Sequence, residues 1–250
     1  MSHSTRAAGS VSLAAKAAAW SVHLFTASGV VWGYLAILAI QRHAWQQTFV
    51  WMGAAVAVDG MDGWLARRCR VKEVLPGFDG SLLDNIVDYI TYALVPAFIF
   101  YQAGLLPPVF AQVAAIAVLL ASAYQFCQKD AKTDQHYFTG FPSYWNVVAF
   151  YLLIWRLDPW INLTLIALFC VLVFIPSRYV YPSRTLAYQR ITLAVVFTWG
   201  ATILLLFFEY PTPQPWVMWL SILCMGYYVA ISVYLMIKSE PAHRSESSSR

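Results

Sequence analysis

The chain has 250 residues, of which 60% are hydrophobic and only 11% are charged. Soluble domains carry about 25% charged residues, so the composition excludes an ordinary soluble protein and indicates several crossings of a membrane. The net charge of +4 suggests no nucleic-acid partner and fits loops that face anionic lipid. The four cysteines form no CxxC pair, which argues against a zinc site or a disulfide framework.

Eight apolar segments have close to the ~20 residues needed to cross a bilayer. They are residues 20–40, 47–67, 82–103, 107–127, 139–156, 159–177, 190–209 and 216–237. The predicted fold is therefore all-α, a polytopic membrane helical bundle of about eight transmembrane helices. The fifth segment is short and has Pro142 near its start, so a re-entrant segment or a tilted helix stays open there.

The two ends of the chain differ from this transmembrane domain, which covers residues 20–238. Residues 1–19 are expected to form an N-terminal interfacial segment with a short amphipathic helix. Residues 239–250 are polar and rich in serine, which predicts a disordered cytoplasmic tail. With the N-terminus inside, fourteen Lys and Arg residues fall on the cytoplasmic side and only Arg42 and Arg156 on the other, as the positive-inside rule requires.

Four aspartates lie where the second and third predicted spans approach the cytoplasm. Asp59 and Asp62 are three residues apart, and Asp84 and Asp88 are four apart, so each pair shares one face of its helix. A short loop joins the two helices, which makes them antiparallel neighbours whose acidic faces can meet. A charge inside a bilayer costs about 2.5–3.5 kcal/mol on insertion scales, so such residues are functional by default.

The crowded carboxylates predict a metal site, because they would repel one another without a cation. Oxygen ligands favour hard ions, so Mn²⁺ or Mg²⁺ is the expected cofactor, and four carboxylates could hold two ions. Gly63, Ala66 and Gly80 lack bulk and would let a nucleotide approach the backbone, while the Arg67 guanidinium could bind a phosphate. The alternatives are an ion-pair network that stabilises a helical hairpin, or a proton or cation transporter.

The order of these residues resembles the signature of the CDP-alcohol phosphatidyltransferase family. That signature reads Asp-x-x-Asp-Gly-x-x-Ala-Arg, a spacer, and Gly-x-x-x-Asp-x-x-x-Asp. It is matched at all eight positions by Asp59, Asp62, Gly63, Ala66, Arg67, Gly80, Asp84 and Asp88. The spacer of twelve residues between Arg67 and Gly80 is longer than is usual in the family, which leaves the conformation of this loop open.

The resemblance implies a metal-dependent transfer of the phosphatidyl group of CDP-diacylglycerol to an alcohol, with release of CMP. It makes Asp88 the base that takes the proton of the attacking hydroxyl. The implied metal ligands are Asp59, Asp62, Asp84 and Asp88. The implied nucleotide and phosphate contacts are Asp59, Gly63, Ala66, Arg67 and Gly80. It further implies a bacterial inner (cytoplasmic) membrane with both termini and the active site on the cytoplasmic side, and a homodimer.

Residues 138–146 are similar to family members that use choline, which makes choline the expected acceptor. Proteins usually hold a quaternary ammonium against aromatic faces. The candidates for this contact are Tyr89, Tyr92, Tyr144, Trp145 and Asn146. In so aromatic a chain, packing or interfacial roles are more frequent for such residues. Serine, inositol phosphate or glycerol phosphate stay open as alternative acceptors.

Overall fold

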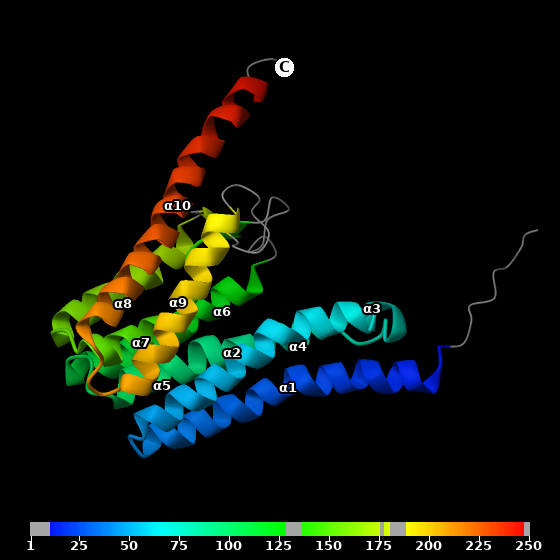
Figure 1. The fold of residues 1–250 in the computed structure, drawn as a ribbon, viewed down its shortest axis with the longest axis horizontal. Helices are drawn as coiled ribbons and strands as arrows, with labels where there is room; N and C mark the ends of the chain where they lie inside the picture. Colours follow the sequence, from blue (N-terminus) through cyan, green and yellow to red (C-terminus); the bar gives the residue numbers. More distant parts are fainter. Residues whose placement is uncertain (1–10, 129–136, 176–177, 181–188, 248–250) are drawn as a thin grey trace, which may run out of the picture.

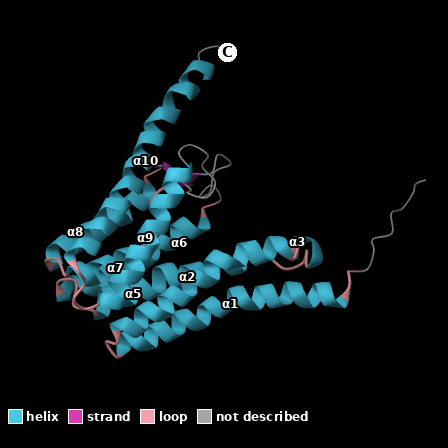
Figure 2. Cartoon of the chain, in the orientation of Figure 1, coloured by secondary structure: helices cyan, strands magenta, loops and turns pink. Residues whose placement is uncertain are grey.

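The fold is that of a computed structural model, which describes residues 11–128, 137–175, 178–180 and 189–247. In these ranges the chain is almost entirely helical, as Figure 2 shows. The prediction of an all-α membrane bundle is confirmed. One small addition is a two-stranded antiparallel ribbon, in which β1 (Tyr137–Thr139) pairs with β2 (Arg178–Val180).

The helices follow the order of the eight predicted spans (Figure 1). They are α1 (Leu13–Gln41), α2 (Trp45–Arg68), α3 (Val71–Val74), α4 (Gly80–Asp88), the π-helical η1 (Tyr89–Leu94), α5 (Val95–Gln102), α6 (Pro108–Cys127), α7 (Trp145–Trp155), α8 (Pro159–Phe174), α9 (Gln189–Glu209) and α10 (Pro215–Ser247). The segments α4, η1 and α5 form one continuous helix. By length and composition, four helices of the described chain can cross a membrane: α1, the continuous helix from Gly80 to Gln102, α6 and α9.

The N-terminal helix α1 begins earlier than its predicted span. Ser12 caps it by accepting a hydrogen bond from the Ala15 N–H, and such a cap satisfies a backbone donor that the first turn leaves free. The helix then runs without a break to Gln41, because the alanine-rich stretch after Leu13 favours helix. Residues 13–19 are therefore the first turns of α1 and not a separate amphipathic helix. Residues 1–10 lie outside the described part.

The fifth predicted span, residues 139–156, contains a much shorter helix. The 11 residues of α7 extend about 16 Å at ~1.5 Å per residue, roughly half of the ~30 Å hydrocarbon layer. Gly140 and Ser143 have positive φ angles of 76° and 55°, a backbone conformation that no α-helix contains. They delay the start of the helix, and Arg156, with φ of 47°, ends it. A helix crossing the whole bilayer is not formed here.

The C-terminal helix α10 continues well past its predicted end. Its 33 residues reach Ser247, so residues 239–247 of the tail predicted to be disordered are helical, and residues 248–250 lie outside the described part. Adding residues to an existing helix avoids the cost of nucleation.

Two glycines bring α1 against the helix that carries Asp84 and Asp88. A methyl group added at Gly29 would overlap the Val87 Cγ1 atom, and one added at Gly33 would lie 2.9 Å from the Ile90 Cγ2 atom. Small residues four apart allow helices in membranes to approach closely. In Figure 1, α1, α2 and α4 point one way and α9 and α10 another. The four signature aspartates, which α2 and α4 carry, therefore lie in the group formed by α1, α2 and α4.

Candidate active site

Three carboxylates from two helices meet in one cluster. Asp59 of α2 and Asp84 and Asp88 of α4 each offer an oxygen atom, and these atoms all lie within 4.8 Å of one another. All three side chains are half-buried. The spacing of four residues places Asp84 and Asp88 on one face of α4, and the turn between α2 and α4 returns the chain so that this face meets Asp59.

The cluster fits a hard divalent cation. Metal–oxygen distances of about 2.0–2.6 Å place the ligand oxygens of one ion within about 5 Å of each other, which agrees with the observed separations. The donors are all carboxylate oxygens, the type that Mg²⁺ and Mn²⁺ prefer. A cation would also offset the mutual repulsion of three half-buried negative charges.

Asp62, the fourth signature aspartate, lies apart from this cluster. In the described part of the chain the group of close carboxylates contains the other three. The Asp62 side chain is only 8% exposed, and its Oδ2 atom accepts a hydrogen bond of 2.9 Å from the Thr26 Oγ1 atom on α1. Sequence reasoning missed Thr26, because a lone threonine 36 residues from its partner has no spacing that links it to the signature.

Tyr92 and Tyr144 are the two choline candidates on the side of the carboxylates. The Tyr92 hydroxyl donates a hydrogen bond of 2.7 Å to the Asp59 Oδ2 atom. The Tyr92 hydroxyl also interacts electrostatically with Asp88 and with Tyr144. Tyr92 belongs to η1, the π-helical turn that starts directly after Asp88, and π-helical turns are frequent at functional sites.

The other three choline candidates are used for packing. The Tyr89 hydroxyl donates to the Leu119 carbonyl oxygen on α6 at 3.1 Å. Trp145 has no exposed surface, and its indole N–H donates to the Ser122 Oγ atom at 2.8 Å. The Asn146 side chain is buried. The two hydrogen bonds join Tyr89 and Trp145 to the neighbouring helix α6.

Two of the small signature residues, Ala66 and Gly80, lie where α2 and α4 pack against α1. The third, Gly63, faces a side chain of its own helix. A methyl group added at Gly80 would lie 2.8 Å from the His23 Cε1 atom of α1. Ala66 packs beside a small buried cluster that contains Ala19 and Val22 of α1. A methyl group added at Gly63 would come within 3.4 Å of the Nη1 atom of Arg67, whose side chain is exposed. Close packing with α1 is thus one reason for small residues at positions 66 and 80.

Comparison with known proteins agrees with this arrangement. Residues 22–176 match the CDP-alcohol phosphatidyltransferase family, a range that contains all eight signature residues. The phosphatidylcholine synthase of Pseudomonas aeruginosa is 39% identical over 219 residues, which cover 88% of this chain and 92% of that protein. That of Legionella pneumophila is 42% identical over 225 residues, with 87% and 88% covered. That of Rhizobium johnstonii is 38% identical over 218 residues, with 87% and 90% covered.

The family match covers more than half of the chain, and the three relatives extend the similarity to nearly all of it. The match includes both helices that supply the clustered carboxylates. The chain belongs to the CDP-alcohol phosphatidyltransferase family.

Proposed function

We propose that this protein transfers the phosphatidyl group of CDP-diacylglycerol to choline, which forms phosphatidylcholine and releases CMP. The observation that carries the proposal is the convergence of Asp59, Asp84 and Asp88 in a chain that is 38–42% identical, over most of its length, to proteins named phosphatidylcholine synthase. Mechanism and specificity then follow from the chemistry of the two substrates.

In the reaction, the choline hydroxyl oxygen attacks the phosphorus atom that carries the diacylglycerol. A new P–O bond forms, the bond from that phosphorus to the bridging oxygen of the pyrophosphate breaks, and CMP leaves. Asp88 takes the proton of the choline hydroxyl, because an alcohol is a poor nucleophile until a positioned base accepts its proton. Asp88 suits this role, since it stands beside two further carboxylates near one end of α4.

Asp59, Asp84 and Asp88 would hold one divalent cation, and Asp62, which lies apart from them, would be a ligand of a second ion. Bound there, Mn²⁺ or Mg²⁺ would neutralise negative charge on the pyrophosphate and on the departing CMP. A second ion would need Asp62, which lies one turn along α2 from Asp59. Tyr92 orients Asp59 through its hydrogen bond. The guanidinium of Arg67, together with Gly63, Ala66 and Gly80, would receive the nucleotide and its phosphates.

Choline would lie against Tyr92, which interacts electrostatically with Asp88, and against its neighbour Tyr144. A quaternary ammonium cannot donate a hydrogen bond, and aromatic faces attract it. A hydroxyl group that reaches Asp88 from such a position would be placed for proton transfer. Tyr89, Trp145 and Asn146 would pack the surrounding helices and lie outside this pocket.

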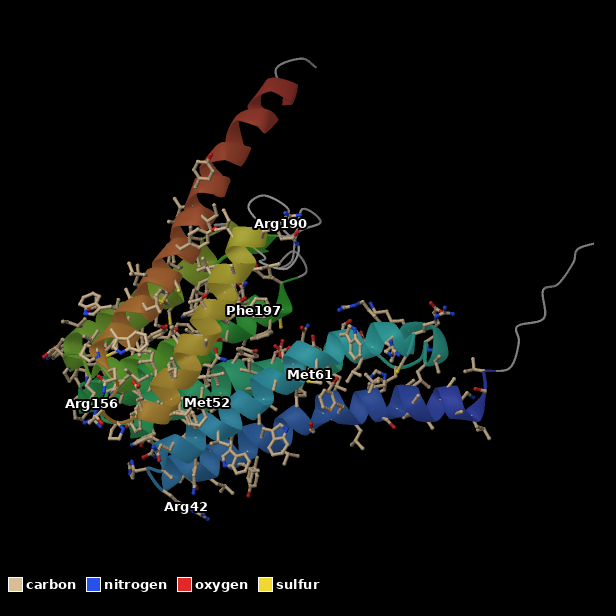
Figure 3. All side chains as sticks on the ribbon, in the orientation of Figure 1. Arg42, Met52, Met61, Arg156, Arg190 and Phe197 are labelled. Atoms are coloured by element: carbon tan, nitrogen blue, oxygen red, sulfur yellow. The ribbon has the colours of Figure 1, made fainter. Side chains whose placement is uncertain are left out.

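We place the protein in the bacterial inner membrane with both termini and the active site on the cytoplasmic side. Figure 3 supports this orientation, because Arg42 and Arg156 lie at one end of the bundle and Arg190 at the opposite end. Met61, which lies between Asp59 and Asp62 in the sequence, is displaced along α2 from Met52 in the direction away from Arg42. This displacement supports a site toward the proposed cytoplasmic end. The homodimer stays a prediction.

The experiment that tests the function offers the purified protein CDP-diacylglycerol, Mn²⁺ and one labelled acceptor at a time. Choline should give labelled lipid and an equal amount of CMP, and EDTA should stop both. Asp88→Asn should abolish CMP release, whereas Glu73→Gln, which alters an exposed acid on α3, should not. Product from serine, inositol phosphate or glycerol phosphate in place of choline would contradict the choline assignment.

A further inference from the structure

Thr26 lies outside the eight signature residues, yet it contacts one of them directly. Its Oγ1 atom donates to the Asp62 Oδ2 atom at 2.9 Å. Both side chains are buried, with 7% and 8% of their surface exposed. A buried carboxylate is costly without hydrogen-bond donors, and a bond from a hydroxyl to an ionised acceptor is among the stronger ones in proteins.

The hydroxyl of Thr26 behaves differently from those of most other threonines in the described helices, although the Thr192 hydroxyl also reaches another helix. Four of them donate to the backbone carbonyl four residues earlier on their own helix, a common arrangement for this residue type. They are Thr48, Thr91, Thr164 and Thr198. Thr26 reaches instead from α1 to α2. Its hydroxyl therefore serves a contact between helices, at a point where α1 faces a signature aspartate.

The backbone that carries Thr26 is held in place by the close approach of α1 to α4. Gly29 lies three residues after Thr26, and its Cα faces the Val87 side chain with no room for a methyl group. Val87 directly precedes Asp88. The position of Thr26 is thus linked through packing to the same helix that supplies two of the clustered carboxylates.

We infer that Thr26 is a positioning residue that orients Asp62 for binding a divalent cation. This inference rests on the metal role of Asp62 in the proposed function. A hydrogen bond to one carboxylate oxygen limits rotation of the group, and Asp62 lies one turn along α2 from Asp59. Loss of such an outer partner of a metal ligand typically weakens metal binding or activity by about 10–100-fold.

The test measures Mn²⁺ binding to the purified full-length protein without substrates, from the paramagnetic resonance signal of free Mn²⁺ during titration. Thr26→Val removes the hydroxyl and nearly keeps the shape, and it should weaken Mn²⁺ binding about 10–100-fold. Thr26→Ser keeps a hydroxyl and should bind as the unmodified protein does. Thr48→Val is the matched control, because Thr48 is fully buried but its hydroxyl bonds within its own helix.

A second comparison tests whether the effect passes through Asp62. In an Asp62→Asn background, Thr26→Val should cause no further loss of Mn²⁺ affinity, since residues that act through one contact are not additive. If Thr26→Val is not recovered folded, Thr26→Ala removes the same hydroxyl and takes its place.

Three results would overturn the inference: unchanged Mn²⁺ affinity without the hydroxyl, an equal loss in Thr48→Val, or a full further loss in the Asp62→Asn background. An unmodified protein that binds no Mn²⁺ would overturn it as well. The assay contains neither CDP-diacylglycerol nor choline. A failure of choline transfer would therefore refute the proposed function and leave this measurement unaffected.

Discussion

Adding a methyl group to either glycine of α1 should disturb the carboxylate cluster from outside it. In Gly33→Ala the new methyl carbon would lie 2.9 Å from the Ile90 Cγ2 atom, whereas carbon atoms in good contact are about 3.5–4.0 Å apart. The two helices must therefore separate by roughly 0.6–1.1 Å. Gly29→Ala requires a larger shift, because its methyl group would overlap the Val87 Cγ1 atom.

The contacted side chains have little freedom to yield. Val87 and Ile90 are β-branched, and in a helix such residues strongly prefer one χ1 rotamer. The backbone of α4 must then move, and Asp88 directly follows Val87. Overpacking of this kind costs about 1–3 kcal/mol of stability, and a displacement of about 1 Å in a catalytic site can lower the rate about 100-fold. Gly29→Ala should therefore lower both the melting temperature and CMP release, and Gly33→Ala should do so less.

The assay compares CMP release and thermal unfolding of the purified variants. Gly53→Ala on α2 is the control, since an added methyl group there meets nothing within 4 Å, and it should retain full activity. Val87→Ala removes the atom that the new methyl group meets, so the double variant Gly29→Ala with Val87→Ala should regain part of the lost activity. Normal turnover in Gly29→Ala would refute the close approach of α1 to α4 as a determinant of the site.

Three further predictions concern single contacts and the cation. Tyr92→Phe removes the 2.7 Å hydrogen bond to Asp59 and keeps the aromatic ring. The affinity for Mn²⁺ should therefore fall about 10-fold or more, with little change in the KM for choline. A variant with a raised KM for choline and unchanged Mn²⁺ affinity would contradict this prediction. Trp145→Phe loses the bond to Ser122 and should destabilise the protein by about 1–3 kcal/mol, as thermal unfolding can measure, without a change in the KM for choline. Removal of divalent cations with EDTA should stop CMP release, and added Mn²⁺ or Mg²⁺ should restore it; activity that persists in EDTA would argue against the metal role.

Local periodicity predicted that Asp59 meets Asp84 and Asp88, but it also placed Asp62 with them, and in the structure Asp62 lies apart from these three. Asp84 and Asp88 share a face of α4 because they are four residues apart, and a short connection makes α2 its antiparallel neighbour. These two facts can be read from the sequence, and they bring Asp59 to the same place. The limits of α2, α6, α9 and the continuous helix from Gly80 to Gln102 follow in the same way from composition and turn residues, whereas the start of α1 and the end of α10 do not.

Contacts between distant helices could not be predicted in this way. The bond between Thr26 and Asp62 depends on how α1 rotates against α2, and no pattern along the chain records that rotation. The shortness of α7 depends on the backbone conformations of Gly140 and Ser143, and that of Ser143 is uncommon for its residue type. The burial of Trp145 among neighbouring helices likewise depends on packing, which made a core residue resemble a choline ligand.

The proposed reaction depends on one cation that α2 and α4 would hold among Asp59, Asp84 and Asp88. The most direct test of this shared site is the Mn²⁺ affinity of the purified protein with each of these residues changed singly to asparagine, in the absence of substrates. All three changes should weaken the same binding event, because the three carboxylates lie within reach of one ion. Affinity that is unaltered in Asp59→Asn, or in both α4 variants, would show that the helices hold no common ion.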